Sequence, residues 1–133
     1  MKALDARVGR PLPVESIVES CDNSGAKAIK IFAVMGGKTV KRRRPACGIG
    51  DLVTGSVVKG RPDMRHTIVF AIVVRQKKEY RRPDGTRVKF EDNAVVILKD
   101  DKGNPKGTIF KGPIAKEAVS RWPGIAKLAG IVV

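Results

Sequence analysis

The sequence predicts a mainly β protein, a small closed barrel of five or six short strands. Three observations support this fold class. The apolar residues come in short runs rich in β-branched side chains, turn-forming residues separate these runs, and no long stretch shows the 3.6-residue period of a helix. Regular short strands of this kind are typical of small barrels. With 133 residues, of which 42% are hydrophobic, the chain has the size and composition of one domain with its own core.

The first elements follow a stretch that we expect to be a tail. Residues 1–15 contain Pro11 and Pro13, show no periodicity and offer little to bury, so we place the single domain at residues 16–133. The β-branched run 16–21 leads into a turn at residues 22–25. Residues 28–34 predict a strand with Ile29, Ile31 and Ala33 on one face.

The central part of the chain predicts three more strands and a hairpin. Residues 52–58 form an apolar run, and residues 67–74 form the most continuous one, which suits a strand buried on both faces. The turn Pro83-Asp84-Gly85 predicts a highly charged hairpin between residues 79–82 and 86–90. Residues 94–98 predict the last strand, and a polar loop follows at 100–107.

The C-terminal part differs from the rest because it predicts short helices, at about residues 113–129. Residues 113–121 suit a helix with proline in its first turn, ended by Pro123-Gly124. Residues 125–129 suit a second single turn.

The charge of the chain points to a polyanionic partner. Lys and Arg number 27 against 13 Asp and Glu, a formal net charge of +14. No apolar run approaches the ~20 residues of a membrane span, so we expect no membrane partner, and no secretory signal is visible. Cys21 and Cys47 lack a metal-binding spacing, and His66 is the one histidine, so we expect a reduced, intracellular protein without metal or cofactor.

The sequence carries no signature of an enzyme. His66 lies in a turn-like stretch that nothing ties to a cysteine or serine nucleophile, so we interpret it as a surface residue. The acidic pairs at residues 91–92 and 100–101 lie in predicted turns, where acids are ordinary turn formers. No phosphate-binding P-loop pattern is present.

The first basic cluster predicts an RNA-binding loop. No acid occurs between Asn23 and Gly50, and the loop that follows Gly36-Gly37 is strongly cationic. Its candidate RNA-binding residues are Lys38, Lys41, Arg42, Arg43 and Arg44. Arginine forks match phosphate oxygens, and we expect these charges to find no acid of the chain nearby. The alternative is a loop that is only solvated.

A second basic cluster surrounds the predicted hairpin. Its members are Arg75, Lys77, Lys78, Arg81, Arg82, Arg87 and Lys89. The first five of these are further candidates for RNA binding. Nearby acids temper the charge, so the alternative, a ribbon whose charges prevent edge-to-edge aggregation, has more weight here than it has for the loop, while contact with RNA or a partner remains the favoured interpretation.

The few aromatic residues favour one mode of RNA recognition. Phe32, Phe70, Phe90 and Phe110 lie in apolar runs and are expected in the core, which leaves Tyr80 and Trp122 for stacking. Single-strand binders and cold-shock barrels stack bases on several exposed rings. The sequence therefore favours recognition of folded RNA by its backbone and shape.

Several motifs, in order along residues 16–133, resemble the universal large-ribosomal-subunit protein fourteen family. They are residues 22–26, Gly36-Gly37, residues 71–74, Arg82-Pro83-Asp84-Gly85, Phe90, Asn93, Val96-Ile97, Gly107-Thr108 and Gly112-Pro113. The longer basic N-terminus and the 41–44 run are similar to the archaeal and eukaryotic-type branch. Residues 122–124 depart from the bacterial pattern, so fine contacts there are not carried over.

The resemblance implies a five-stranded barrel with a projecting β-ribbon and small C-terminal helices. It also implies a cytoplasmic, ribosome-associated structural protein that binds large-subunit ribosomal RNA and contributes to an intersubunit bridge. The implied partners are small-subunit ribosomal RNA across the interface, neighbouring large-subunit proteins and an anti-association factor docked on the C-terminal region.

Position in the chain suggests that the C-terminal region faces the subunit interface or a docking factor. Lys111, Lys116 and Arg121 meet only one acid there, and apolar residues are mixed among them. The alternative is that Ile114, Val119 and Trp122 close the open end of the barrel.

Overall fold

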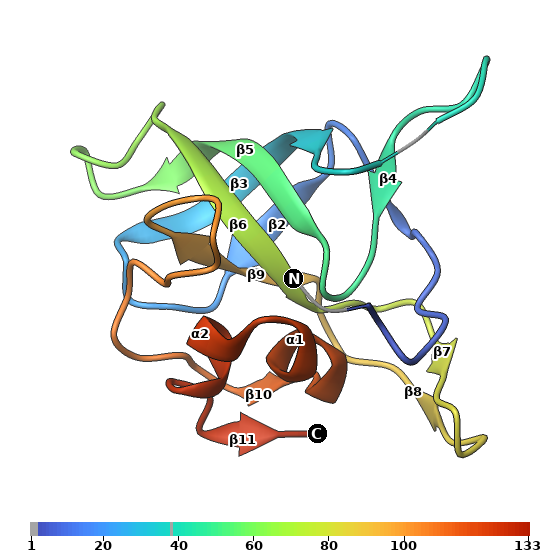
Figure 1. Cartoon of the computed structure of the whole chain (residues 1–133). Coiled ribbons are helices and arrows are strands. Elements are labelled where there is room, and N and C mark those ends of the chain that lie inside the picture. The colour runs from blue at the N-terminus through green and yellow to red at the C-terminus, as the bar shows by residue number, and fades with distance from the viewer. Residues whose placement is uncertain (1–2, 38) are drawn as a thin grey trace.

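The protein is built on a closed barrel of five strands, as the sequence predicts (Figure 1). A computed structural model describes residues 3–37 and 39–133. The barrel strands are β2 (Ile17–Ser20), β3 (Ala26–Val34), β5 (Leu52–Gly60), β6 (Ile68–Arg75) and β9 (Ala94–Leu98). They are hydrogen-bonded in that order, and the parallel pairing of β2 with β9 closes the circle, whereas the other four pairings are antiparallel.

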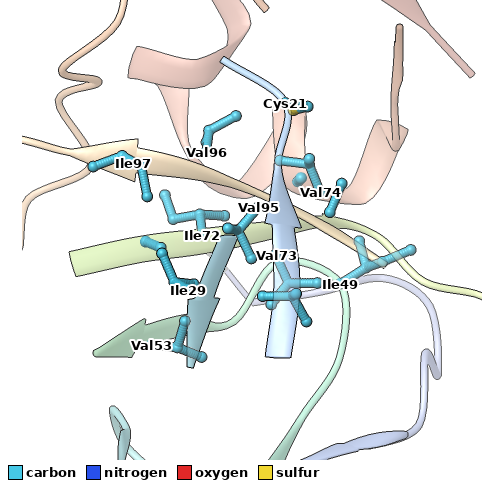
Figure 2. Close-up of a cluster of buried hydrophobic side chains, with 14 of the residues drawn as sticks. Cys21, Ile29, Ile49, Val53, Ile72, Val73, Val74, Val95, Val96 and Ile97 are labelled. Atoms are coloured by element: carbon cyan, nitrogen blue, oxygen red, sulfur yellow. The ribbon is translucent and has the colours of Figure 1, made fainter. Parts of the chain in front are cut away.

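The core lies inside the barrel and beneath the C-terminal segment, and it consists mainly of Val and Ile (Figure 2). All five residues of β9 are buried. The prediction that residues 67–74 are buried on both faces holds only for their second half. Ala71–Val74 are buried, but Ile68 is 70% exposed. Its end of the strand extends past β9, which pairs only from Phe70 onward.

Two short antiparallel pairs flank the barrel. The predicted charged hairpin is present, with β7 (Tyr80–Arg81) paired to β8 (Arg87–Val88). Gly85, at a φ of 90°, sits in the turn between them, where a left-handed conformation favours glycine. The other pair joins β1 (Leu12–Pro13) to β4 (Ala46–Cys47) and was not predicted.

The C-terminal segment contains short helices, but their boundaries differ from the prediction. Pro113 lies in a strand, because β10 (Pro113–Ile114) pairs in parallel with β11 (Ile131–Val132). The first helix, α1 (Lys116–Arg121), therefore begins later than expected. The proline that starts a helix is Pro123, in the first turn of α2 (Pro123–Ala126).

The expectation that residues 1–15 bury little is wrong for the described part of that stretch. Val8 is 6% exposed, and Leu12 is also buried in the core. The side-chain amide of Gln76 donates to the carbonyl oxygen of Val8 over 2.7 Å. This segment is thus packed on the barrel, and its division from residues 16–133 as a separate tail stays a prediction.

The aromatic residues are distributed differently from the prediction. Phe32 is 49% exposed, because it alternates with the buried Ile31 along β3. Tyr80 and Trp122, expected to be available for stacking, are both buried. The indole nitrogen of Trp122 donates to the carbonyl oxygen of Gly50 over 2.8 Å, so this side chain is bound to the segment between β4 and β5.

Candidate nucleic-acid interface

The loop between β3 and β4 carries four consecutive exposed basic residues, at positions 41–44, and extends away from the barrel at the upper right of Figure 1. Every residue from Thr39 to Arg44 is exposed. Lys41, Arg42 and Arg43 form no ion pair with any described residue. The predicted binding residue Lys38 lies outside the described residues.

Arg44 does find an acid, contrary to the expectation for this loop. Its guanidinium lies 3.0 Å from the Glu15 carboxylate and donates to the carbonyl oxygen of Val14 over 3.1 Å. Pairing of β1 with β4 brings these two stretches of chain together. An acid distant in sequence thus anchors the base of the loop, and Lys41, Arg42 and Arg43 remain free.

In the second basic cluster, only part of the predicted set faces solvent. Lys77, Lys78 and Arg81 are exposed. Along β7 the side chains alternate, so Arg81 points outward and Tyr80 inward. The charged ends of these three residues are therefore open to solvent.

Arg75 instead has an internal role. It is 9% exposed, and its guanidinium binds the Asp92 carboxylate through two bonds of 2.9 and 3.1 Å. The same group donates to the carbonyl oxygens of Lys111 and Pro113, both at 3.0 Å. Arg75 therefore joins the end of β6 to the C-terminal segment, and its donors are not available to RNA in this structure.

Arg82 is similarly engaged, with Glu117 of α1. The guanidinium Nε lies 2.8 Å from the carboxylate, and the hydroxyl of Tyr80 donates to the same carboxylate over 2.8 Å. The hydrogen bond to Glu117 raises the pKa of Arg82. Burial first, and then Glu117, raises the pKa of Tyr80. These three side chains fasten the ribbon to helix α1.

The C-terminal candidates divide in the same way. Lys111 and Lys116 are exposed. Arg121 lies 3.4 Å from the Asp51 carboxylate, and its Nε is buried without a hydrogen-bond partner. Ile114 and Trp122 are buried and Val119 is half-buried, so the first two are not available as surface anchors, and the alternative that the three residues close the barrel stays a prediction.

Sequence reasoning missed several polar residues that position the basic surfaces. Gln76 is fully buried, and its Oε1 accepts from the backbone of Ile49 over 3.0 Å. The Asn23 Oδ1 accepts from the backbone of Thr108 and Ile109, which holds the loop before β10. A buried glutamine has no distinctive sequence pattern. Asn23 lies in the predicted turn at residues 22–25, so the sequence did mark its position as a turn.

The one histidine and the two cysteines are the residues that the sequence offered as candidates for catalysis. His66 is exposed in the β5–β6 turn. Burial raises the pKa of Cys21 to about 11 and that of Cys47 to about 12, so both remain protonated thiols at neutral pH. Across residues 3–37 and 39–133, no group of three or more His, Cys, Asp and Glu could hold a metal ion. No helix in these ranges is long and apolar enough to cross a membrane.

The fold and its surface define a class: small, strongly basic β-barrel proteins in which some arginines are held internally by acids while a loop and a ribbon present exposed cations. Comparison with known proteins makes this class specific. The family model described as ribosomal protein L14p/L23e matches residues 11–133. The chain therefore belongs to the ribosomal protein L14p/L23e family, which is structural rather than catalytic, and the resemblance seen in the sequence is confirmed.

The similarity to curated relatives extends over almost the whole length of both chains. A large ribosomal subunit protein uL14 from Nanoarchaeum equitans is 58% identical over 133 residues, covering 100% of both chains. Proteins of the same name from Methanococcus maripaludis and Methanococcus vannielii are 51% and 49% identical, each covering 99% of both chains.

Proposed function

We propose that this chain is a structural constituent of the large ribosomal subunit and binds large-subunit ribosomal RNA directly. The observation that supports RNA binding is the exposed loop 39–44, where Lys41, Arg42 and Arg43 project without acidic partners. Free cations gain most when they replace the counterions of RNA phosphates. Lys77, Lys78 and Arg81 extend the positive surface, whereas the internal bonds of Arg75 and Arg82 exclude them from it. Family membership is consistent with a cytoplasmic, ribosome-associated protein.

The test replaces Arg42 and Arg43 with Gln and measures binding to protein-free large-subunit ribosomal RNA over a series of salt concentrations. We expect the slope of log affinity against log salt to fall by about 1.4 to 1.8, because each of the two lost phosphate contacts contributes roughly 0.7 to 0.9. The matched control replaces Lys59 and Arg65, exposed at the far end of the β5–β6 hairpin, with Gln.

Equal slopes for the two double variants would show that the loop does not contact phosphate. Sedimentation of a cell extract tests the wider proposal. The protein should remain with large subunits after a moderate-salt wash, and its recovery only at the top of the gradient would refute a role as a ribosomal constituent.

We further propose that the C-terminal segment faces the small subunit, with its ribosomal RNA, or an anti-association factor. Lys111 and Lys116 are the exposed cations that support this assignment. Arg121 is a poor test residue, because reversing its charge would place an acid beside Asp51 and disturb the fold. A variant with Lys111→Glu and Lys116→Glu should enter large subunits but impair subunit joining. Exclusion from large subunits would assign these residues to the RNA-anchoring surface instead.

A further inference from the structure

The N-terminal segment at residues 7–11 lies between the two basic regions of the barrel. In Figure 1 it is the blue stretch on the right, between β4 above and the β7–β8 ribbon below. The side-chain amide of Gln76 donates to the carbonyl oxygen of Val8, and the carbonyl oxygen of Gly9 lies so close to Gly48 that a Cβ there would collide with it. The segment is therefore held against the barrel, so the backbone of Arg7 and Arg10 has little conformational freedom even before a ligand binds.

This placement puts three arginines in adjacent positions of neighbouring chain segments. Arg7 forms an antiparallel bridge with Arg81, and Arg81 is paired with Arg87 across the ribbon. Like charges directly opposite one another destabilise paired strands. Only Arg87 has an acidic partner, Glu79, at 3.0 Å. A row of this kind costs the free protein stability, and an anion that neutralises it would offset that cost.

The row lines a hollow of about 350 Å³ that is open to solvent and strongly positive. Its cationic lining residues are Arg7, Arg10, Lys78, Arg81 and Arg87. Glu79 is the one acid among the residues that line it. All five cations are exposed, so no main-chain movement is needed for a ligand to reach them.

Arg10 connects this hollow to the loop. It also lines the neighbouring hollow formed by Thr39, Val40, Arg43, Arg44 and Ala46. Two clusters that lie more than thirty positions apart in the chain thus share one arginine. Exposed basic side chains therefore line two neighbouring hollows, which extend from the loop past residues 7–11 to the ribbon.

We propose that Arg7 and Arg10 join the loop and the ribbon into one continuous site for the phosphodiester backbone of RNA. The inference deepens the proposed function and rests on it. A line of arginine forks suits a ligand that repeats its negative charge along a chain, because each phosphate can accept two parallel hydrogen bonds. The fixed backbone of the segment lowers the ordering cost of binding. Both arginines precede residue 11, where the family match begins.

The test uses the full chain with Arg7→Gln and Arg10→Gln, and protein-free large-subunit ribosomal RNA as the probe. We expect the log–log salt slope to fall by about 1.5, and affinity at moderate salt to fall by at least tenfold. The conservative pair Arg7→Lys and Arg10→Lys should recover most of the slope, since it keeps both charges. The control is again Lys59→Gln with Arg65→Gln.

Thermal unfolding separates binding from a purely structural role. Removing charge from the arginine row should leave the midpoint of the free Gln variant unchanged or raise it, whereas residues needed for the fold would lower it. A lowered midpoint that the Lys pair does not restore would overturn the proposal.

The failure of this inference can be told from the failure of the proposed function. If the wild type binds the RNA with a steep salt slope and the Arg7/Arg10 variant matches its control, only the continuous site is wrong. If the wild type shows no salt-dependent binding at all, the proposed function is wrong. Unchanged RNA affinity together with loss of a neighbouring acidic protein from the assembled subunit would assign the hollow to a protein partner and overturn the proposal.

Discussion

The loop at residues 39–44 and the junction between the ribbon and the C-terminal helices are both rich in arginine, yet they use it in opposite ways. In the loop, Arg42 and Arg43 are exposed and meet no acid among the described residues. At the junction, Arg75 and Arg82 are largely buried and bound to the carboxylates of Asp92 and Glu117.

The difference shows that an arginine's role depends on which acid the fold brings to it. Arg75 and Asp92 are separated by 17 positions, and Arg82 and Glu117 by 35. A desolvated guanidinium is stable only when its donors are paired, so these contacts hold elements together. An arginine without such a partner keeps its donors for a ligand. Three predictions test this contrast, in order of their expected effect on stability.

The largest effect should come from Arg75. Replacing it with Met leaves Asp92 without its partner and removes two hydrogen bonds to the C-terminal segment, so we expect a loss of about 2 to 3 kcal/mol in unfolding free energy. Urea denaturation measures it. Lys77→Met is the matched control on an exposed neighbour and should change stability by less than about 0.5 kcal/mol. Similar values for both variants would contradict an internal role for Arg75.

An intermediate effect should come from Tyr80 at alkaline pH. Its pKa in the folded protein lies above the ordinary value of 10.0. The unfolded chain therefore loses this proton first, so the associated stability is complete below pH 10 and falls as the pH rises further. The expected loss is about 1.4 kcal/mol per pH unit.

Tyr80→Phe should cost about 1 kcal/mol at neutral pH and show a flatter decline above pH 10. Both proteins carry the same buried thiols of Cys21 and Cys47, so the difference between their curves isolates Tyr80. Parallel curves would mean that Tyr80 titrates normally.

The smallest effect should come from the loop. The variant with Arg42→Gln and Arg43→Gln should unfold within about 0.5 kcal/mol of the wild type, because neither side chain has a partner to lose. Arg44→Gln removes the exposed pair with Glu15 and should cost no more than about 1 kcal/mol. A loss of 2 kcal/mol in the double variant would remove the contrast between the two regions.

Much of the fold was predictable because strand patterns and turn residues are local signals. Residues 94–98 were predicted with the bounds of β9, and the hairpin turn at Pro83–Gly85 follows from proline and glycine chemistry. The short pairs β1–β4 and β10–β11 were missed, because two-residue strands carry no periodicity and depend on distant partners. The displaced start of α1 has the same cause.

The candidate site was predictable only where charge is crowded in sequence. A run such as 41–44 has no room for compensating acids of its own, so exposure was the correct expectation. The ribbon residues were harder to separate, since Arg81 and Arg82 are adjacent and face opposite environments. The placement of Arg7 and Arg10 beside the ribbon had no local signal, because it depends on how the N-terminal segment packs on the barrel.

The sequence by itself determined the barrel class, the net positive charge and the family, because composition, strand patterning and ordered motifs are properties of the chain. Only the tertiary structure decided which cations are free. Closure of the barrel and the docking of α1 bring Asp92, Glu117 and Asp51 to three of the arginines. Because Val8 is packed in the core, its neighbours Arg7 and Arg10 lie between the loop and the ribbon. Coulombic pairing depends on distance in space, which separation along the chain does not specify.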